Sequence, residues 1–229
     1  SPIWWGSWGL ALSHLFFMLG TVPYHFVLPD VYQGTSAPVL AYLSAVPRLA
    51  AVAVLLRLFT QSFSALPLPL QAQAQEGLAA LALLTIVVGN TAALRQRNLQ
   101  RLMAYAAIGH GGLLMAGIAA GPSYAVALLY YSIVYGAMTL AIWIGINLLQ
   151  QHAKEGMCLQ DYRGLGGRFP MLSIGITWVM LALIGLPPTA GFIGKWLIFT
   201  ALWAHWCATG SRLFALLLLA SLLSTVLSL

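Results

Sequence analysis

Four basic side chains lie inside long apolar stretches of the sequence: Lys195, His110, Arg48 and His14. A charge at the centre of a membrane helix costs about 2.5–3.5 kcal/mol, so residues of this kind inside such helices usually serve a function. Lysine and histidine can exchange protons near neutral pH when their surroundings tune them. Arginine stays protonated and can instead hold a carboxylate or order a chain of water molecules. This combination favours movement of protons or cations over a bond-making reaction.

Three of these residues also have a simpler structural interpretation. A lysine close to a helix end can extend its ammonium group to the membrane surface, but Lys195 lies about midway between Pro170 and Gly210. Arg48 follows a proline and could bond the backbone groups freed there. His110, which is flanked by glycines, could be a hydrogen-bonding strut between helices. The sequence alone leaves these interpretations open.

No other site chemistry is recognisable in the sequence. There is no phosphate-binding loop, no His and carboxylate set with metal-ligand spacing, no haem or quinone motif, and no nucleophile beside a base. The two cysteines, Cys158 and Cys207, are far apart and lack the spacing of a metal site. We therefore expect no cofactor and no metal in this chain.

The composition is that of a membrane protein. Of 229 residues, 61% are hydrophobic and 6% are charged, whereas soluble domains carry roughly 25% charged residues. Ten basic and four acidic side chains could not cover the surface of a soluble globule of this size. This excludes a cytosolic enzyme and a nucleic-acid-binding protein. We attribute the net charge of +6 to membrane topology rather than to an acidic partner.

The apolar stretches predict an all-α polytopic membrane protein with about seven transmembrane helices, since a crossing needs about 20 mostly apolar residues. The sixth stretch is too long for one straight crossing and is interrupted by prolines, which predicts two half-helices broken at Pro187/Pro188. Residues 61–75 are predicted to form a loop. The seven predicted spans are 4–27, 38–60, 76–93, 98–119, 123–149, 170–204 and 210–229.

Basic residues in the loops predict the orientation. One side of the membrane would carry six of them and the other only Arg57 and Arg212, so the positive-inside rule places the first side in the cytoplasm. Because the chain starts at Ser1 and stops at Leu229 inside an apolar run, we expect residues 1–229 to be a single membrane domain of a longer protein. The six cytoplasmic residues are Arg95, Arg97, Arg101, Lys154, Arg163 and Arg168.

Four motifs follow one another along the chain: PDVYQG at 29–34, NLQRLMAY at 98–105, DYRG at 161–164 and GLPPTAGFIGK at 185–195. In this order they resemble the antiporter-like membrane subunits of respiratory complex I, NADH:quinone oxidoreductase. The PDVYQG form is similar to subunit N, called subunit 2 in mitochondria, rather than to its L and M relatives. The motifs extend over nearly the whole chain, so the resemblance is specific.

The resemblance implies a subunit of about fourteen transmembrane helices, of which this chain would form about the seventh to the thirteenth. Such a subunit belongs to a translocase and moves protons through buried Lys, His and Glu side chains, coupled to quinone reduction elsewhere, with no redox chemistry in this chain. Its partners would be the other complex I membrane subunits and the lipid bilayer, with no nucleic acid. Quinone and NADH would be bound by other subunits. Its location would be the bacterial inner (plasma) membrane.

The resemblance also places the four basic residues on a proton path. Lys195 matches the lysine on the family's broken twelfth helix, and His110 matches a histidine on the tenth. Arg48 stands where the eighth helix usually has a lysine. The lysine of the seventh helix is replaced by Met18, and His14, one turn earlier on the same helix face, could take over its role.

Three functions are compatible with these residues. The leading one is a proton-translocating membrane subunit of NADH:quinone oxidoreductase. A cation/proton antiporter or a membrane-hydrogenase subunit would share the lysines and broken helices, although the PDVYQG form argues against it. A structural spacer that no longer pumps is favoured by Met18 and Arg48 and opposed by Lys195 and His110.

Overall fold

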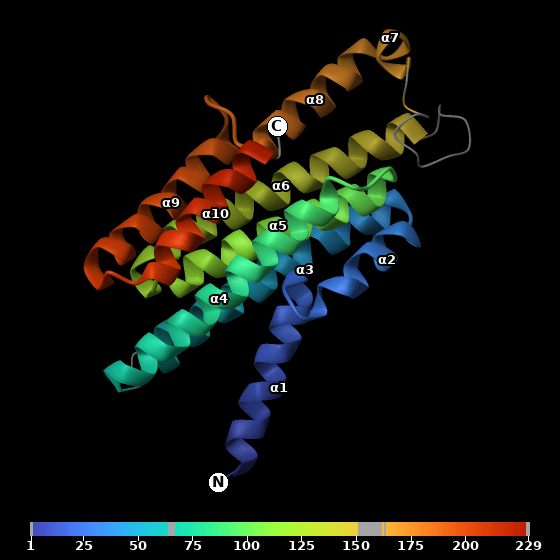
Figure 1. Ribbon diagram of the computed structural model, residues 1–229. Coiled ribbons are helices and arrows are strands. Elements are labelled where there is room, and N and C mark those ends of the chain that lie inside the picture. The colour runs from blue at the N-terminus through green and yellow to red at the C-terminus, as the bar shows by residue number, and fades with distance from the viewer. Residues whose placement is uncertain (1, 64–66, 151–161, 163, 228–229) are drawn as a thin grey trace.

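The structure is a computed structural model that describes residues 2–63, 67–150, 162 and 164–227. Within these residues it is helical throughout and contains no strand, which confirms the all-α prediction. Figure 1 shows the long helices running side by side as a bundle, with α1 projecting from one side of it. The helices are α1 (Pro2–Leu19), α2 (Val27–Gln33), α3 (Ala37–Leu58), α4 (Leu68–Ala93), α5 (Leu99–Ala119), α6 (Ala125–Gln150), α7 (Leu165–Arg168), α8 (Pro170–Ile184), α9 (Ala190–Thr209) and α10 (Arg212–Leu227).

The prediction of several membrane crossings agrees with the lengths of these helices. Among the residues that the structure describes, five helical segments are long and apolar enough to cross a membrane, and α8 and α10 are shorter apolar helices. The predicted spans correspond in order to α1 with α2, α3, α4, α5, α6, α8 with α9, and α10. The five long segments are Gly9–Gln33, Ala37–Gln61, Leu68–Ala93, Leu99–Ala119 and Pro122–Gln150.

The sixth predicted span is broken, as its prolines predict. Helix α8 ends at Ile184, and Gly185 then takes a left-handed backbone conformation with φ of 89°. After the two prolines, Thr189 caps the start of α9 with its side chain. The break at Pro187/Pro188 is therefore confirmed, and it leaves the last carbonyl groups of α8 available to other donors.

The first predicted span is also broken, so the expectation of one helix over 4–27 is wrong. Helix α1 ends at Leu19, Gly20 has φ of 70°, and a single 3-10 turn leads into α2. Glycine adopts this left-handed conformation without the steric penalty that a Cβ atom brings. Pro23 follows, and its missing N–H prevents the α1 hydrogen bonds from continuing.

The third predicted span begins earlier than hydropathy indicates. Helix α4 starts at Leu68 rather than at residue 76, so much of the predicted 61–75 loop is helical. Pro69 lies in the first turn of α4, where proline is tolerated because its N–H would have no helical partner. The glutamines that follow it are good helix formers despite their polarity.

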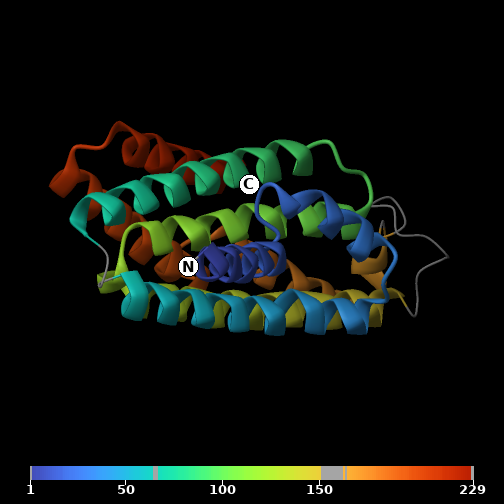
Figure 2. The same cartoon turned by 90° about the horizontal axis from the view of Figure 1, so that it is seen from below.

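Helix α5 is the central helix of the bundle. Figure 2 shows α3 and α6 together on one side, α4 on the opposite side and α5 between them. Every residue of α5 from Gly111 to Ala119 is buried. The contact with α4 is so close that a Cβ atom on Gly112 would lie 2.9 Å from the backbone nitrogen of Ile86. This packing fixes the position of His110 on the same helix.

Figure 1 shows the α4–α5 connection and the C-terminal end of α6 at the same end of the bundle, while the α9–α10 connection lies at the opposite end. Of the residues predicted to face the cytoplasm, Arg95, Arg97 and Arg168 are exposed. Arg101 pairs with Asp30 at 3.5 Å. Lys154 and Arg163 lie outside the described residues.

Candidate functional site

Three of the four predicted site residues lie in the interior of the bundle and come from different helices. Arg48 on α3 is 2% exposed and Lys195 on α9 is 3% exposed. His110 on α5 is partly buried. The fourth residue, His14 on α1, is exposed. Buried charges need partners, so the contacts of the three interior residues define the site.

Arg48 connects three helices through one of its two terminal nitrogens. Its Nη1 atom donates to the carbonyl oxygen of Ala107 on α5 at 2.7 Å and to the hydroxyl of Tyr135 on α6 at 3.0 Å. The guanidinium carbon also lies 5.7 Å from the centre of the Tyr135 ring. Arg48 thus pairs across helices rather than with backbone groups of its own helix near Pro47.

His110 bonds to a second tyrosine of α6. Its Nδ1 atom is 2.6 Å from the hydroxyl oxygen of Tyr131, and the tautomer decides which group donates. The imidazole ring also lies 4.9 Å, between ring centres, from Tyr135. Both tyrosines are fully buried. His110 is therefore one short hydrogen bond from Tyr131 and in ring contact with the tyrosine that binds Arg48.

Lys195 binds the end of the half-helix that precedes its own. Its Nζ atom donates to the carbonyl oxygen of Ile184, the last residue of α8, at 2.8 Å. A cation is favoured there because the unpaired carbonyl groups give a helix C-terminus a partial negative charge. Gly185 leaves room for the side chain, since a Cβ atom at that position would lie 3.0 Å from Lys195 Cδ.

A small cavity of about 20 Å³ joins His110 to Lys195. One water molecule needs roughly 10–15 Å³ of such space, together with polar partners. The cavity, which both residues line, therefore has room for a single water. Its other lining residues are Asn90, Ala106, Gly109, Leu113, Ser224 and Thr225.

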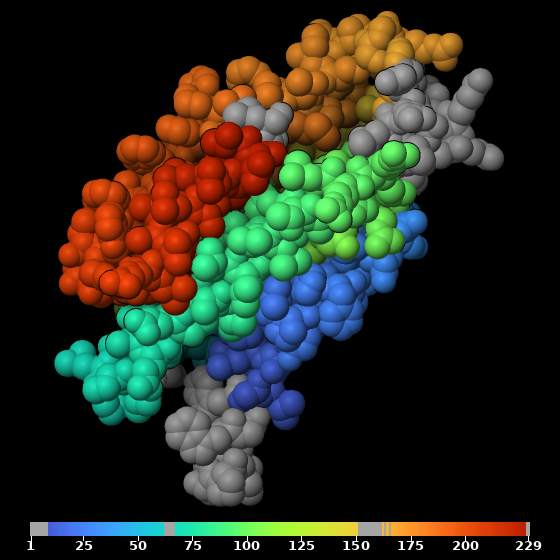
Figure 3. Space-filling view, viewed as in Figure 1, coloured from blue at the N-terminus to red at the C-terminus, as the bar shows by residue number. Residues whose placement is uncertain are grey.

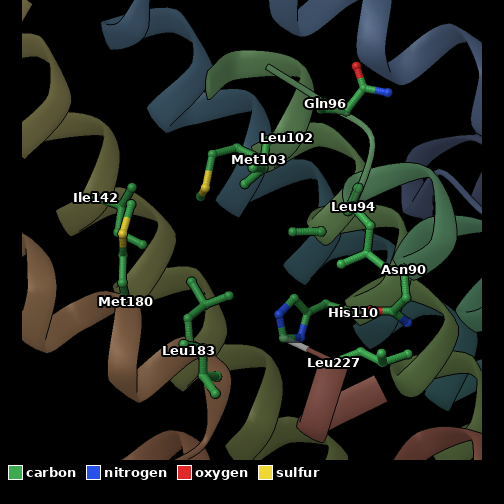
Figure 4. Close-up of a pocket in the computed structure, with 13 residues that line it drawn as sticks. Asn90, Leu94, Gln96, Leu102, Met103, His110, Ile142, Met180, Leu183 and Leu227 are labelled. Atoms are coloured by element: carbon green, nitrogen blue, oxygen red, sulfur yellow. The ribbon is translucent and has the colours of Figure 1, made fainter. Parts of the chain in front are cut away.

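A second cavity, of about 410 Å³, reaches His110 from the end of the bundle that carries the α4–α5 connection. Figure 4 shows His110 and Asn90 near its inner end and Gln96 at the other end, with Met103 and Met180 along the wall. Most of the lining is apolar. On the face shown in Figure 3, the side chains of α4 and α10 lie next to each other at the surface of the bundle.

Comparison with known proteins identifies the family. Residues 4–225 match a protein-family model described as NADH:quinone oxidoreductase/Mrp antiporter, transmembrane. The chain belongs to this family.

Named relatives include "NADH-quinone oxidoreductase subunit N" of Trichlorobacter lovleyi, 38% identical over 192 residues, which are 83% of this chain and 39% of that protein. The subunit N of Desulfovibrio desulfuricans is 39% identical over 206 residues, 86% of this chain and 40% of the relative. "NAD(P)H-quinone oxidoreductase subunit 2" of Crocosphaera subtropica is 35% identical over 227 residues, 96% and 42% respectively. The chain spans about two fifths of the length of these relatives.

Solved structures of related complexes contain chains with a similar fold. A chain of respiratory complex I from Thermus thermophilus with bound aureothin is 34% identical, with a TM-score of 0.76, over 96% of this chain and 46% of that one. A chain of the Mrp complex from Dietzia sp. DQ12-45-1b has a TM-score of 0.78 over 93% of this chain and 39% of that one. At 18% identity it shows a shared fold alone.

Among the described residues, His14 makes no polar contact with the other three predicted site residues. Its side chain is exposed on α1, whereas Met18, one turn later, is partly buried against the apolar core. Within the described part of the chain, no hydrogen bond joins His14 to Arg48, His110 or Lys195. A role for His14 in place of the missing lysine therefore stays a prediction.

Two site residues were not predicted from the sequence, Tyr131 and Tyr135. Both are neutral, so a search for charges inside apolar stretches passes over them. Their spacing of four residues was a usable signal, because residues four apart share a helix face. Two hydroxyls on one face of a membrane helix must find partners, and here the partners are His110 and Arg48.

The described residues contain no group of three or more His, Cys, Asp or Glu side chains placed to hold a metal ion. Cys207 is a free, exposed thiol, and Cys158 lies outside the described residues.

Proposed function

We propose that this chain is the C-terminal part of an antiporter-like subunit of the subunit N type. It would move protons across the bacterial inner (plasma) membrane within an NADH:quinone oxidoreductase. Residues 1–229 would be a single membrane domain, in contact with lipid and with other membrane subunits of that complex. Quinone and NADH would bind to those other subunits, and this chain would perform no redox step.

The observation that carries the proposal is the series of buried polar groups across the bundle. Arg48 is hydrogen-bonded to Tyr135, whose ring contacts that of His110. His110 is in turn hydrogen-bonded to Tyr131 and lines the small cavity together with Lys195. The part from His110 to Lys195 suits protons, which move between groups linked by short hydrogen bonds or by one water. A larger substrate would need a continuous pore.

The two titratable members of this series can pass a proton between them. Lys195 Nζ holds a proton against the Ile184 carbonyl and can release it to a water in the small cavity. The His110 imidazole can accept or deliver a proton through its ring nitrogens, one of which is bonded to Tyr131. Because like charges repel strongly in a low-dielectric interior, a proton arriving at one site favours release from the other.

Arg48 cannot take part in proton transfer, because its guanidinium group stays protonated. Its role in the proposed function is a fixed charge that holds Tyr135 and α5 in place. Together with Met18, it leaves the spacer interpretation as the second candidate. The specific observation in favour of the spacer is that neither residue can titrate where the family usually has lysine.

Two Lys195 variants separate these functions. Lys195→Ala in the assembled complex should lower NADH-driven proton pumping in inverted membrane vesicles more than it lowers assembly or NADH oxidation. Lys195→Arg keeps a cation at the end of α8 but cannot release its proton, so it should assemble normally and still fail to pump. Normal pumping by Lys195→Arg, or equal loss of assembly and pumping in Lys195→Ala, would support the spacer.

A further inference from the structure

Three buried polar atoms have no hydrogen-bond partner among the described residues: Nδ1 of His25, Nη2 of Arg48 and the hydroxyl oxygen of Tyr32. The last two belong to side chains that are almost fully buried. Arg48 is 2% exposed and Tyr32 is 1% exposed. Buried polar atoms in folded proteins nearly always bond to a protein group or to an ordered water. Arg48 Nη2 and the Tyr32 hydroxyl are therefore each expected to bond to a ligand such as an ordered water.

The break after α1 shows where Arg48 Nη2 points. A Cβ atom built on Gly20 would lie 3.6 Å from Nη2 and 3.0 Å from Cδ2 of Leu28. The free side of the guanidinium group thus faces Gly20 and the face of α2 that carries Leu28. Tyr32 is four residues further along α2, which places it on that same face.

The Tyr32 ring is held in place on this side of the bundle. It packs edge-on against the ring of Trp143 on α6, with 5.8 Å between ring centres. Trp143 lies about two helical turns after Tyr135, the residue of α6 that binds Arg48. The Tyr32 side chain is therefore buried in the same part of the bundle as the guanidinium group.

The nearby carboxylate is not the ligand. Asp30, on the same short helix, is exposed and lies 3.5 Å from Arg101. Arg48 Nη2 can only donate hydrogen bonds, whereas a tyrosine hydroxyl can both donate and accept. A water molecule fits both requirements, because it accepts from Nη2 and exchanges a hydrogen bond with the hydroxyl.

We propose that one buried water bridges Arg48 Nη2 and the Tyr32 hydroxyl, and that Tyr32 is thereby a further member of the polar series. This rests on the proposed function. The series then extends from the bundle centre to α2, whose Gln33 accepts a hydrogen bond from Arg101 at 2.8 Å. That end of the bundle carries the α4–α5 connection (Figure 1).

Tyr32→Phe tests this inference, because it keeps the ring that packs on Trp143 and removes only the hydroxyl. High-resolution cryo-electron microscopy of the assembled complex should show a water within hydrogen-bond distance of both atoms. Tyr32→Phe should lose or displace that water and lower the number of protons pumped per NADH oxidised. Tyr42→Phe is the matched control, since Tyr42 is an exposed tyrosine on α3, and it should pump as wild type does.

Three results would overturn the inference. One is a protein side chain bonded to Arg48 Nη2 in place of the water. Another is the same water in the same position in Tyr32→Phe. The third is unchanged pumping by Tyr32→Phe in a complex where Lys195→Ala does lower pumping. If instead Lys195→Ala also pumps normally, the proposed function itself fails, and the two failures are thereby distinguished.

Discussion

The ammonium group of Lys195 and the carbonyl oxygen of Ile184 form a 2.8 Å hydrogen bond that closes the broken sixth span. One bond thus joins the proposed proton carrier of α9 to the last residue of α8. A neutral amine still donates a hydrogen bond to this carbonyl, but it loses the attraction between a cation and the negative end of the helix. Loss of the proton would therefore weaken the connection between the two half-helices.

Gly185→Ala should disturb this connection. The φ of 89° at this position is unfavourable for alanine, by about 1–2 kcal/mol. The added Cβ would also lie 3.0 Å from Lys195 Cδ. We expect a lower thermal unfolding temperature and reduced proton pumping in membrane vesicles. Gly175→Ala on α8 is the control, because a Cβ there meets nothing within 4 Å, and it should leave both measurements unchanged.

Tyr131→Phe should interrupt the series at its shortest side-chain contact. The change removes the 2.6 Å hydrogen bond to His110 and costs about 1 kcal/mol of stability. Proton pumping per NADH should fall, while NADH oxidation in uncoupled vesicles stays close to wild type. The neighbouring Tyr130→Phe provides the comparison. Equal pumping by both variants would remove Tyr131 from the path.

Arg48→Met and Arg48→Lys should differ in stability. Methionine leaves the Tyr135 hydroxyl without its donor and the Ala107 carbonyl with its helical partner alone, and a buried unpaired group costs about 1–3 kcal/mol. Lysine can still donate to these acceptors. We expect Arg48→Met to reduce the amount of assembled complex on native gels and Arg48→Lys to preserve it. Equal assembly of the two would show that the fixed charge has no structural role.

The proposed role of His14 gives a prediction that separates titration from hydrogen bonding. If His14 carries protons in place of the missing lysine, His14→Gln should lower pumping, because glutamine can donate a hydrogen bond but cannot titrate. Met18→Lys should then restore pumping to that variant. Normal pumping by His14→Gln in reconstituted vesicles would exclude the relay, an outcome compatible with the exposed position of His14 on α1.

Hydropathy predicts most of the helices. The helix breaks that it misses have a physical explanation. The break at Pro187/Pro188 is visible in the sequence because two consecutive prolines cannot continue a helix. The break at Gly20 has a weaker signal, because a lone glycine is also common inside membrane helices and only one proline, Pro23, follows it. The backbone conformation of Gly20, which lies against Leu28 of α2 and Arg48, places the break.

The site was predictable only in part, because some of its contacts depend on how the helices pack. Lys195, Arg48 and His110 stand out because a charged or titratable group in an apolar helix is costly. The two tyrosines of α6 carry no charge, and their importance comes from the partners that other helices bring to them. Which hydroxyl meets which base depends on helix rotation, which hydropathy does not determine.

The close contact between α4 and α5 at their glycines limits how these two helices can move relative to each other. A Cβ on Gly89 would lie 2.9 Å from the Cα of Gly109, and one on Gly112 would lie 2.9 Å from the nitrogen of Ile86. If α4 slid along α5, larger side chains would enter these recesses and collide with backbone. We therefore expect α5, which carries His110, to keep its position relative to α4. Any change in the distance between His110 and Lys195 would then come from displacement of helices α8 and α9.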